Sequence, residues 1–62
     1  MTPEQAKAAI LVEWRALPKE KRADDIERIQ FITEVRRRYV FPSKADRYQV
    51  IKGWLVEEER GW

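Results

Sequence analysis

Three prolines divide this 62-residue chain into segments that are each long enough for one helix. Pro3, Pro18 and Pro42 have no backbone N–H to donate, and each disfavours helical geometry at the residue before it. Between these breaks, apolar residues recur every three or four positions, which is the spacing of a helix with one buried face. No alternating run is long enough for a strand, and no Asn-Gly hairpin signal occurs. The sequence therefore predicts an all-α protein.

The first segment predicts a helix over residues 3–17. Thr2 and Gln5 have the spacing of a capping box, in which the Thr side chain accepts a hydrogen bond from a free N–H of the first turn. Pro3 suits the first helical position because no N–H is needed there. The helix should end just before Pro18. Its buried stripe is expected to consist of Ala6, Ile10, Trp14 and Leu17.

The second segment predicts a helix over residues 24–40, with two possible starts. Asp24 followed by Glu27 resembles a second capping box, whereas a helix beginning at Pro18 would run straight into the segment. We favour a short helical turn or loop over 18–23 and a main helix from Ala23 or Asp24. The predicted apolar face spans roughly half the circumference at ~100° per residue, as expected of a middle helix packed on both others. It contains Ile26, Ile29, Ile32, Val35, Tyr39 and Val40.

The third segment predicts a helix over residues 44–60, with Ser43 as its N-cap. Its apolar face is Tyr48, Ile51, Trp54 and Leu55. Gly61 should end the helix in the left-handed conformation, and Trp62 should fold back toward Val56. Three helices with short connections predict a single domain, residues 1–62, folded as a small up-down-up three-helix bundle. Its predicted core is Trp14, Ile29, Ile32, Ile51 and Leu55.

The residue types that are missing exclude several kinds of chemistry. No Cys and no His occur, so the chain offers no thiol nucleophile, disulfide, imidazole base or ordinary zinc site. Ser43 therefore has no His to activate it. The acidic runs at 24–25 and 57–59 fall at helix ends, where solvent keeps carboxylates ionised, and no glycine-rich phosphate loop is present. We expect a non-enzymatic protein with no cofactor, no metal and no small-molecule substrate.

Membrane insertion is not expected, and the chain shows no export signal. The longest apolar run, Ala8 to Val12, is far too short to span a bilayer. The first residues lack a basic stretch followed by an apolar one, so no signal peptide is predicted. The sequence therefore predicts a cytoplasmic protein without a membrane partner.

Thirteen basic and eleven acidic residues give a net charge of +2, but the charges are unevenly placed. Glu57, Glu58 and Glu59 would oppose the dipole of the last helix, so we expect ion pairs with Lys19, Lys21 and Arg22. The bundle topology gathers cations at its opposite end, against Asp46 alone. We call this group the basic pole: Arg36, Arg37, Arg38, Lys44 and Arg47. The three consecutive arginines also complement the dipole of their own helix.

Binding to another protein, or to a second copy of this chain, is the first functional hypothesis. Phe31 lies outside the predicted core arc among polar residues, which is typical of a contact anchor. Val12 and Trp54 are further candidate contact residues. Gly53 interrupts a helix at a cost of about 1 kcal/mol relative to Ala, so it marks either a close backbone approach or a tolerated surface position. A small accessory, adaptor or inhibitor protein, of the sort common in bacteria and phages, fits these features.

Nucleic-acid binding is the alternative hypothesis, because a basic pole at the junction of two helices resembles a helix-turn-helix arrangement. Residues 44–60 would then form the recognition helix. The length of the 24–40 helix argues against this arrangement. So do the three glutamates at 57–59, which phosphate would repel. We therefore rank nucleic acid second.

Overall fold

The computed structural model describes residues 1–60, which form four α-helices. They are α1 (Pro3–Ala16), α2 (Lys19–Ala23), α3 (Asp25–Arg38) and α4 (Arg47–Arg60). No strand occurs among these residues, so the all-α prediction is confirmed. Gly61 and Trp62, with the helix ending predicted for them, lie outside the described residues.

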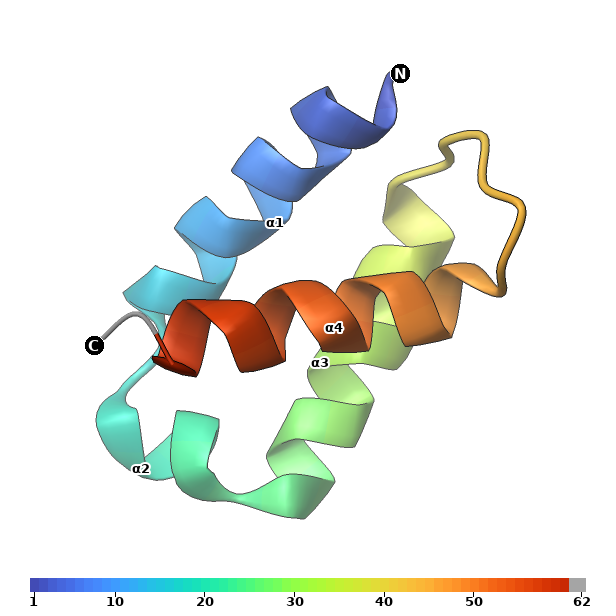
Figure 1. Cartoon of the computed structure of the whole chain (residues 1–62). Coiled ribbons are helices and arrows are strands. Elements are labelled where there is room, and N and C mark those ends of the chain that lie inside the picture. Colours follow the sequence, from blue (N-terminus) through green and yellow to red (C-terminus); the bar gives the residue numbers. More distant parts are fainter. Residues whose placement is uncertain (61–62) are drawn as a thin grey trace.

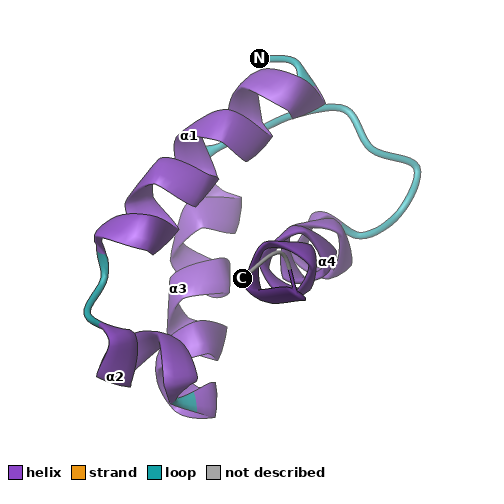
Figure 2. Cartoon of the chain, turned by 60° about the vertical axis from the view of Figure 1, so that its left-hand side comes forward, coloured by secondary structure: helices purple, strands orange, loops and turns teal. Residues whose placement is uncertain are grey.

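The arrangement of the helices differs from the predicted up-down-up bundle. α1 and α3 run in opposite directions, and α4 crosses both of them (Figure 1). Figure 2 shows α4 nearly end-on while α1 and α3 are seen from the side. α4 packs on both α1 and α3, so it takes the middle place that the sequence suggested for residues 24–40. The loop over residues 39–46 is long enough to carry the chain across the pair instead of back along it.

One core joins the three long helices. The predicted stripe of α1 is confirmed: Ala6, Ile10 and Trp14 are fully buried, and the partly buried Leu17 packs against them. Ile51 and Leu55 of α4 are also fully buried. The loop adds Phe41, which is buried and lies 5.2 Å from the ring of Trp54. The complete core is Ala6, Ile10, Leu11, Trp14, Ile32, Val35, Phe41, Ile51 and Leu55.

Two of the predicted helix starts are confirmed by their hydrogen bonds. Thr2 accepts from the backbone N–H of Gln5 at 3.2 Å, and Gln5 accepts from that of Thr2 at 3.1 Å. Asp24 accepts from the backbone N–H groups of Ile26 at 2.8 Å and Glu27 at 3.2 Å. The short helical turn expected over 18–23 is α2.

The predicted start of the last helix, with Ser43 as its N-cap, is wrong because α4 begins at Arg47. The Asp46 carboxylate accepts from the backbone N–H of Tyr48 at 2.9 Å, directly before the first helical residue. The Ser43 hydroxyl instead donates to the backbone oxygen of Ala45 at 2.8 Å, within the loop. A carboxylate at this place also complements the helix dipole, which a hydroxyl does not. The preceding helix likewise ends earlier than predicted, at Arg38 rather than residue 40.

The rotation of α3 about its axis also differs from the prediction. Ile32 and Val35 are buried as expected, but Ile29 is 52% exposed and Ile26 is 67% exposed. Phe31 takes their place, because its ring packs 5.1 Å from that of Trp14. Ile29 is therefore not a core residue, and Phe31 is not the solvent-facing residue that we expected.

The cap assignment predicts different costs for two neighbouring substitutions. Asp46→Ala should lower the free energy of unfolding by about 1 kcal/mol, because the first turn of α4 loses its acceptor. Asp46→Asn keeps an acceptor and should be close to wild type. Ser43→Ala should change little, since its hydroxyl binds only within the loop. Urea unfolding measures all three variants, and a larger loss for Ser43→Ala than for Asp46→Ala would contradict the assignment.

The rotation of α3 predicts a contrast between two apolar residues. Phe31→Ala should cost about 2 kcal/mol, less than the ~3–5 kcal/mol of a fully buried Phe because the side chain is half-buried. Ile29→Ala, on the exposed side, should change stability by no more than about 0.5 kcal/mol. Thermal unfolding followed by circular dichroism compares them. A larger loss of stability for Ile29→Ala than for Phe31→Ala would support the rotation of the helix predicted from sequence.

Candidate functional site

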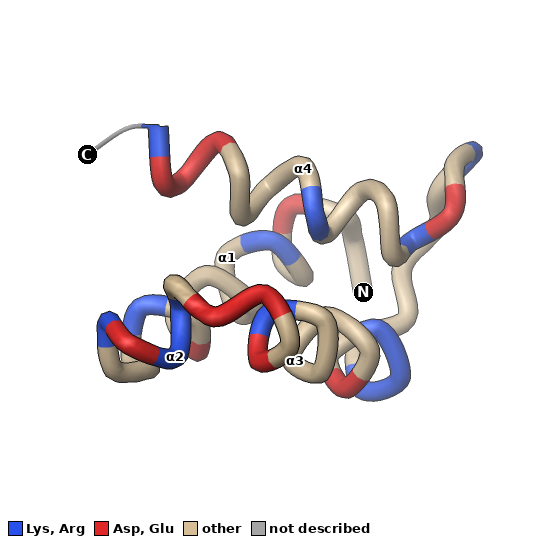
Figure 3. Tube along the Cα trace, turned by 90° about the horizontal axis from the view of Figure 1, so that it is seen from below, with Lys and Arg blue, Asp and Glu red and all other residues tan. Residues whose placement is uncertain are grey.

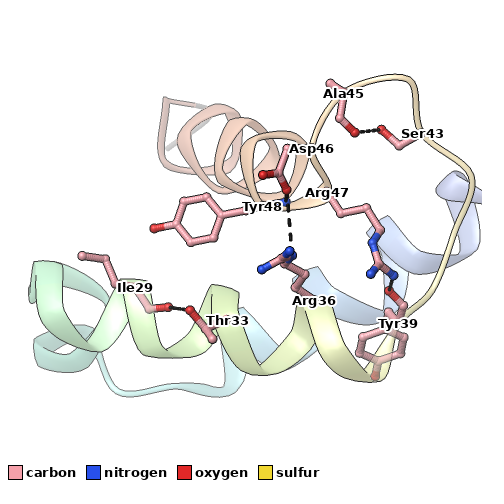
Figure 4. Close-up of polar contacts among 9 residues, drawn as sticks. All are labelled: Ile29, Thr33, Arg36, Tyr39, Ser43, Ala45, Asp46, Arg47 and Tyr48. Carbon is pink, nitrogen blue, oxygen red and sulfur yellow. Dashed lines mark hydrogen bonds and ion pairs between the residues drawn. The ribbon is translucent and has the colours of Figure 1, made fainter.

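The solvent-facing side of α3 carries an exposed apolar pair next to two arginines. Steps of three and four residues place Ile26, Ile29, Thr33, Arg36 and Arg37 on one side of the helix, and all five are exposed. We call these five residues the outer face of α3. The Thr33 hydroxyl donates to the backbone oxygen of Ile29 at 2.9 Å, so its hydrogen-bonding need is met within the helix (Figure 4).

The outer face of α3 changes character along the helix. Its N-terminal half presents the two isoleucines, and its C-terminal half presents the two arginines. Exposed branched aliphatic side chains next to arginines form a surface suited to protein contacts, because Arg is enriched in interfaces and the apolar pair supplies area to bury.

The contact residues predicted from sequence have separate locations. Phe31 is partly buried against Trp14, and Trp54 is partly buried against Phe41. Val12 alone among the three is well exposed, at 64%. It lies in a shallow surface depression along α1 that is also lined by Glu4, Lys7, Ala8, Leu11 and Arg15. The structure therefore does not bring Phe31, Val12 and Trp54 together on one exposed surface.

The members of the basic pole do lie at one end of the molecule. Figure 3 shows the Lys and Arg positions at the end of α3, in the loop and at the start of α4 on the same side. Arg36 is 3.8 Å from Asp46, and Arg47 donates to the backbone oxygen of Tyr39 at 3.4 Å (Figure 4). Within residues 1–60, Arg37 and Lys44 are exposed and make no ion pair.

The basic pole faces more acid than the sequence suggested, because Glu13 of α1 reaches it. Arg38 and the Tyr39 hydroxyl both donate to the Glu13 carboxylate, and Arg38 also lies 3.9 Å from Glu34. Burial raises the pKa of Glu13, but the two hydrogen bonds outweigh it and hold that pKa below its ordinary value of 4.5. The hydrogen bond to Glu13 and burial both raise the pKa of Tyr39.

The glutamates at the end of α4 are paired, although with different cations from those predicted. Lys7 lies 3.9 Å from Glu57, Arg15 donates to Glu58, and Arg28 donates to Glu59 at 2.8 Å. These cations belong to α1 and α3, whereas we expected Lys19, Lys21 and Arg22 of the first connection. The crossing of α4 over both helices explains the change of partners (Figure 1).

Comparisons with known proteins add no family to this description. The chain matches no protein-family model, no curated protein and no solved structure. In the part of the chain that the structure covers, no helix has both the length and the apolarity needed to cross a membrane.

The Glu13 contacts predict a pH-dependent contribution to stability. Because the folded state lowers the pKa of Glu13, this stabilisation is fully present above about pH 4.5 and is lost as the pH falls through the lowered value. Glu13→Gln should therefore lower the free energy of unfolding more near pH 7 than near pH 2. Glu20→Gln is the matched control, since Glu20 makes no ion pair within residues 1–60. Urea unfolding at both pH values measures the difference, and an equal loss at both would refute it.

Proposed function

We propose that this protein is a non-enzymatic binding protein whose outer face of α3 docks on another protein. The observation that carries the proposal is the exposure of Ile26 and Ile29 one helical turn apart. Fully burying an exposed Ile is worth about 1.5–3 kcal/mol, and Ile26 and Ile29 are 67% and 52% exposed, so the pair offers part of a binding free energy. An accessory, adaptor or inhibitor role agrees with a small chain that presents the outer face of α3 for binding.

The charges next to the isoleucines indicate the chemistry of the partner. Arg36 and Arg37 follow the apolar pair on the same side of α3, and Arg37 has no ion pair within residues 1–60. Their guanidinium groups favour carboxylates, which they bind through two parallel hydrogen bonds. The partner surface should therefore present an apolar patch flanked by Asp or Glu. The partner is then a different protein or a second copy of this chain.

The double variant Ile26→Ser/Ile29→Ser tests the proposal. Because both side chains are exposed, the variant should keep its helicity while losing the apolar contact. Light scattering over a concentration series measures self-association, and a pull-down from the source cell compares the proteins retained by each bait. Val12→Ser is the control, because it removes an equally exposed apolar side chain from α1. We expect at least one protein that wild type and Val12→Ser retain and that the double variant does not retain.

Two results together would contradict the docking proposal. The first is a wild-type chain that stays monomeric at every concentration. The second is a double variant that retains the same proteins as wild type. Self-association that the double variant abolishes would identify the second copy as the partner.

Nucleic acid is the second candidate, and the exposed Arg37 and Lys44 of the basic pole are what favour it. If each contacts one phosphate, the log of the affinity for duplex DNA should fall with the log of salt at a slope of about −1.8. Arg37→Gln/Lys44→Gln should remove that dependence. We expect weak or no duplex binding, because the other three cations are engaged within the fold. Micromolar binding at physiological salt, abolished by these changes, would make nucleic acid the primary partner.

A further inference from the structure

A pocket of about 470 Å³ opens where all four helices approach one another, away from the basic pole. Its lining comes from the end of α1, from α2, from the start of α3 and from the end of α4. Its volume falls in the range of small-molecule sites, roughly 300–1,000 Å³. The residues that line it are Trp14, Lys19, Arg22, Ala23, Arg28 and Glu59.

The lining of the pocket is positively charged. Three cations face one carboxylate, and Arg28 donates to that carboxylate, Glu59, at 2.8 Å. Lys19 and Arg22 form no ion pair within residues 1–60. The pocket therefore holds two cations that make no ion pair within residues 1–60, in a concave place where an anion would be attracted.

Hydrogen-bond donors without acceptors gather at the same pocket. The indole Nε1 of Trp14 and the Nε atoms of Arg22 and Arg28 are buried and have no hydrogen-bond partner in residues 1–60. Buried donors are nearly always paired in folded proteins, and each unpaired one is costly. Trp14 is also completely buried, so its N–H has no access to bulk solvent. These unpaired donors lie behind the surface of the pocket, next to the cations that line it.

The remainder of the lining is apolar. Ala23 and Trp14 are its uncharged residues, and the long side chains of Lys19 and Arg22 carry aliphatic stems below their charged ends. Arg28 lies over the ring of Trp14, with its guanidinium carbon 6.0 Å from the ring centroid. An apolar wall next to cations suits a ligand that has an oxyanion at one end and a flat hydrophobic body at the other.

We propose that this pocket binds a small aromatic anion carrying a carboxylate or a phosphate. Arg22 and Lys19 hold the oxyanion, and the aromatic body lies over Ala23 and the aliphatic stems. The site shares no residue with the outer face of α3. It is therefore independent of the protein-docking proposal.

Calorimetric titration of the full chain with three probes tests the site. Phenyl phosphate and phenylacetate carry the two head groups, and benzyl alcohol carries the ring without a charge. At least one anion should bind with a Kd on the order of 10⁻⁴ M, as suits a ligand of this size, and benzyl alcohol should bind more weakly. In NMR spectra the bound anion should shift the indole N–H signal of Trp14. Comparing phenyl phosphate with phenylacetate identifies the preferred head group.

The variant Arg22→Gln distinguishes anion binding in this pocket from a general attraction of anions to a basic protein. It should weaken anion binding about tenfold or more, the effect of losing a charge-assisted contact. The fold should be retained, because the Arg22 side chain makes no hydrogen bond within residues 1–60. Lys52→Gln makes the same change of charge on an exposed part of α4 outside the pocket, and it should bind like wild type.

Two results would overturn the assignment. One is that neither anion binds more tightly than benzyl alcohol. The other is that Arg22→Gln and Lys52→Gln bind the anions equally well. The variant Ile26→Ser/Ile29→Ser should bind the anion like wild type, so failure of the docking proposal and failure of this one remain distinguishable.

Discussion

The packing of Trp14 against Phe31 is the contact on which the rest of the structure depends. Trp14 is fully buried, and its ring lies 5.1 Å from that of Phe31 at an angle of 47°. A helix rotates as a unit, so placing Phe31 toward α1 turns Ile26 and Ile29 toward solvent. The same contact brings Arg28 over the indole, where it forms one side of the cationic pocket. One aromatic pair thus positions both candidate binding surfaces.

Ion pairs between distant segments accompany the unusual direction of α4. The three glutamates of its last turn would oppose the helix dipole, but each meets a cation from α1 or α3. At the other end of the molecule, Glu13 joins α1 to the end of α3 through Arg38 and Tyr39. Exposed pairs of this kind add little stability individually. The three pairs of the last turn nevertheless form where α4 crosses the other two long helices.

Local features of the fold could be predicted from the sequence, and features decided by distant contacts could not. The caps at Thr2 and Asp24 depend on residues within three positions, and both were predicted correctly. The rotation of α3 is different, because two overlapping sets of apolar residues fit the helical period. Both sets include Ile32 and Val35, which Ile26 and Ile29 extend on one side and Phe31 extends on the other. Only the position of Trp14, from another helix, selects the second set. Ser43 was predicted as the cap of the last helix, but Asp46 takes that place, and the burial of Phe41 in the loop agrees with the later start of α4.

The candidate sites follow the same division. Val12 is exposed as its place outside the α1 stripe suggests, but Leu11 next to it is buried; Ile26 and Ile29 were assigned to the apolar face for the reason just given. The pocket could not be predicted, because its lining residues are spread from Trp14 to Glu59 and come from all four helices.

The most direct measurement is the pattern of nuclear Overhauser effects from the Trp14 indole in solution. The structure predicts cross-peaks to the Phe31 ring and none to Ile29. Cross-peaks to Ile29, with the Phe31 ring in solvent, would contradict the account.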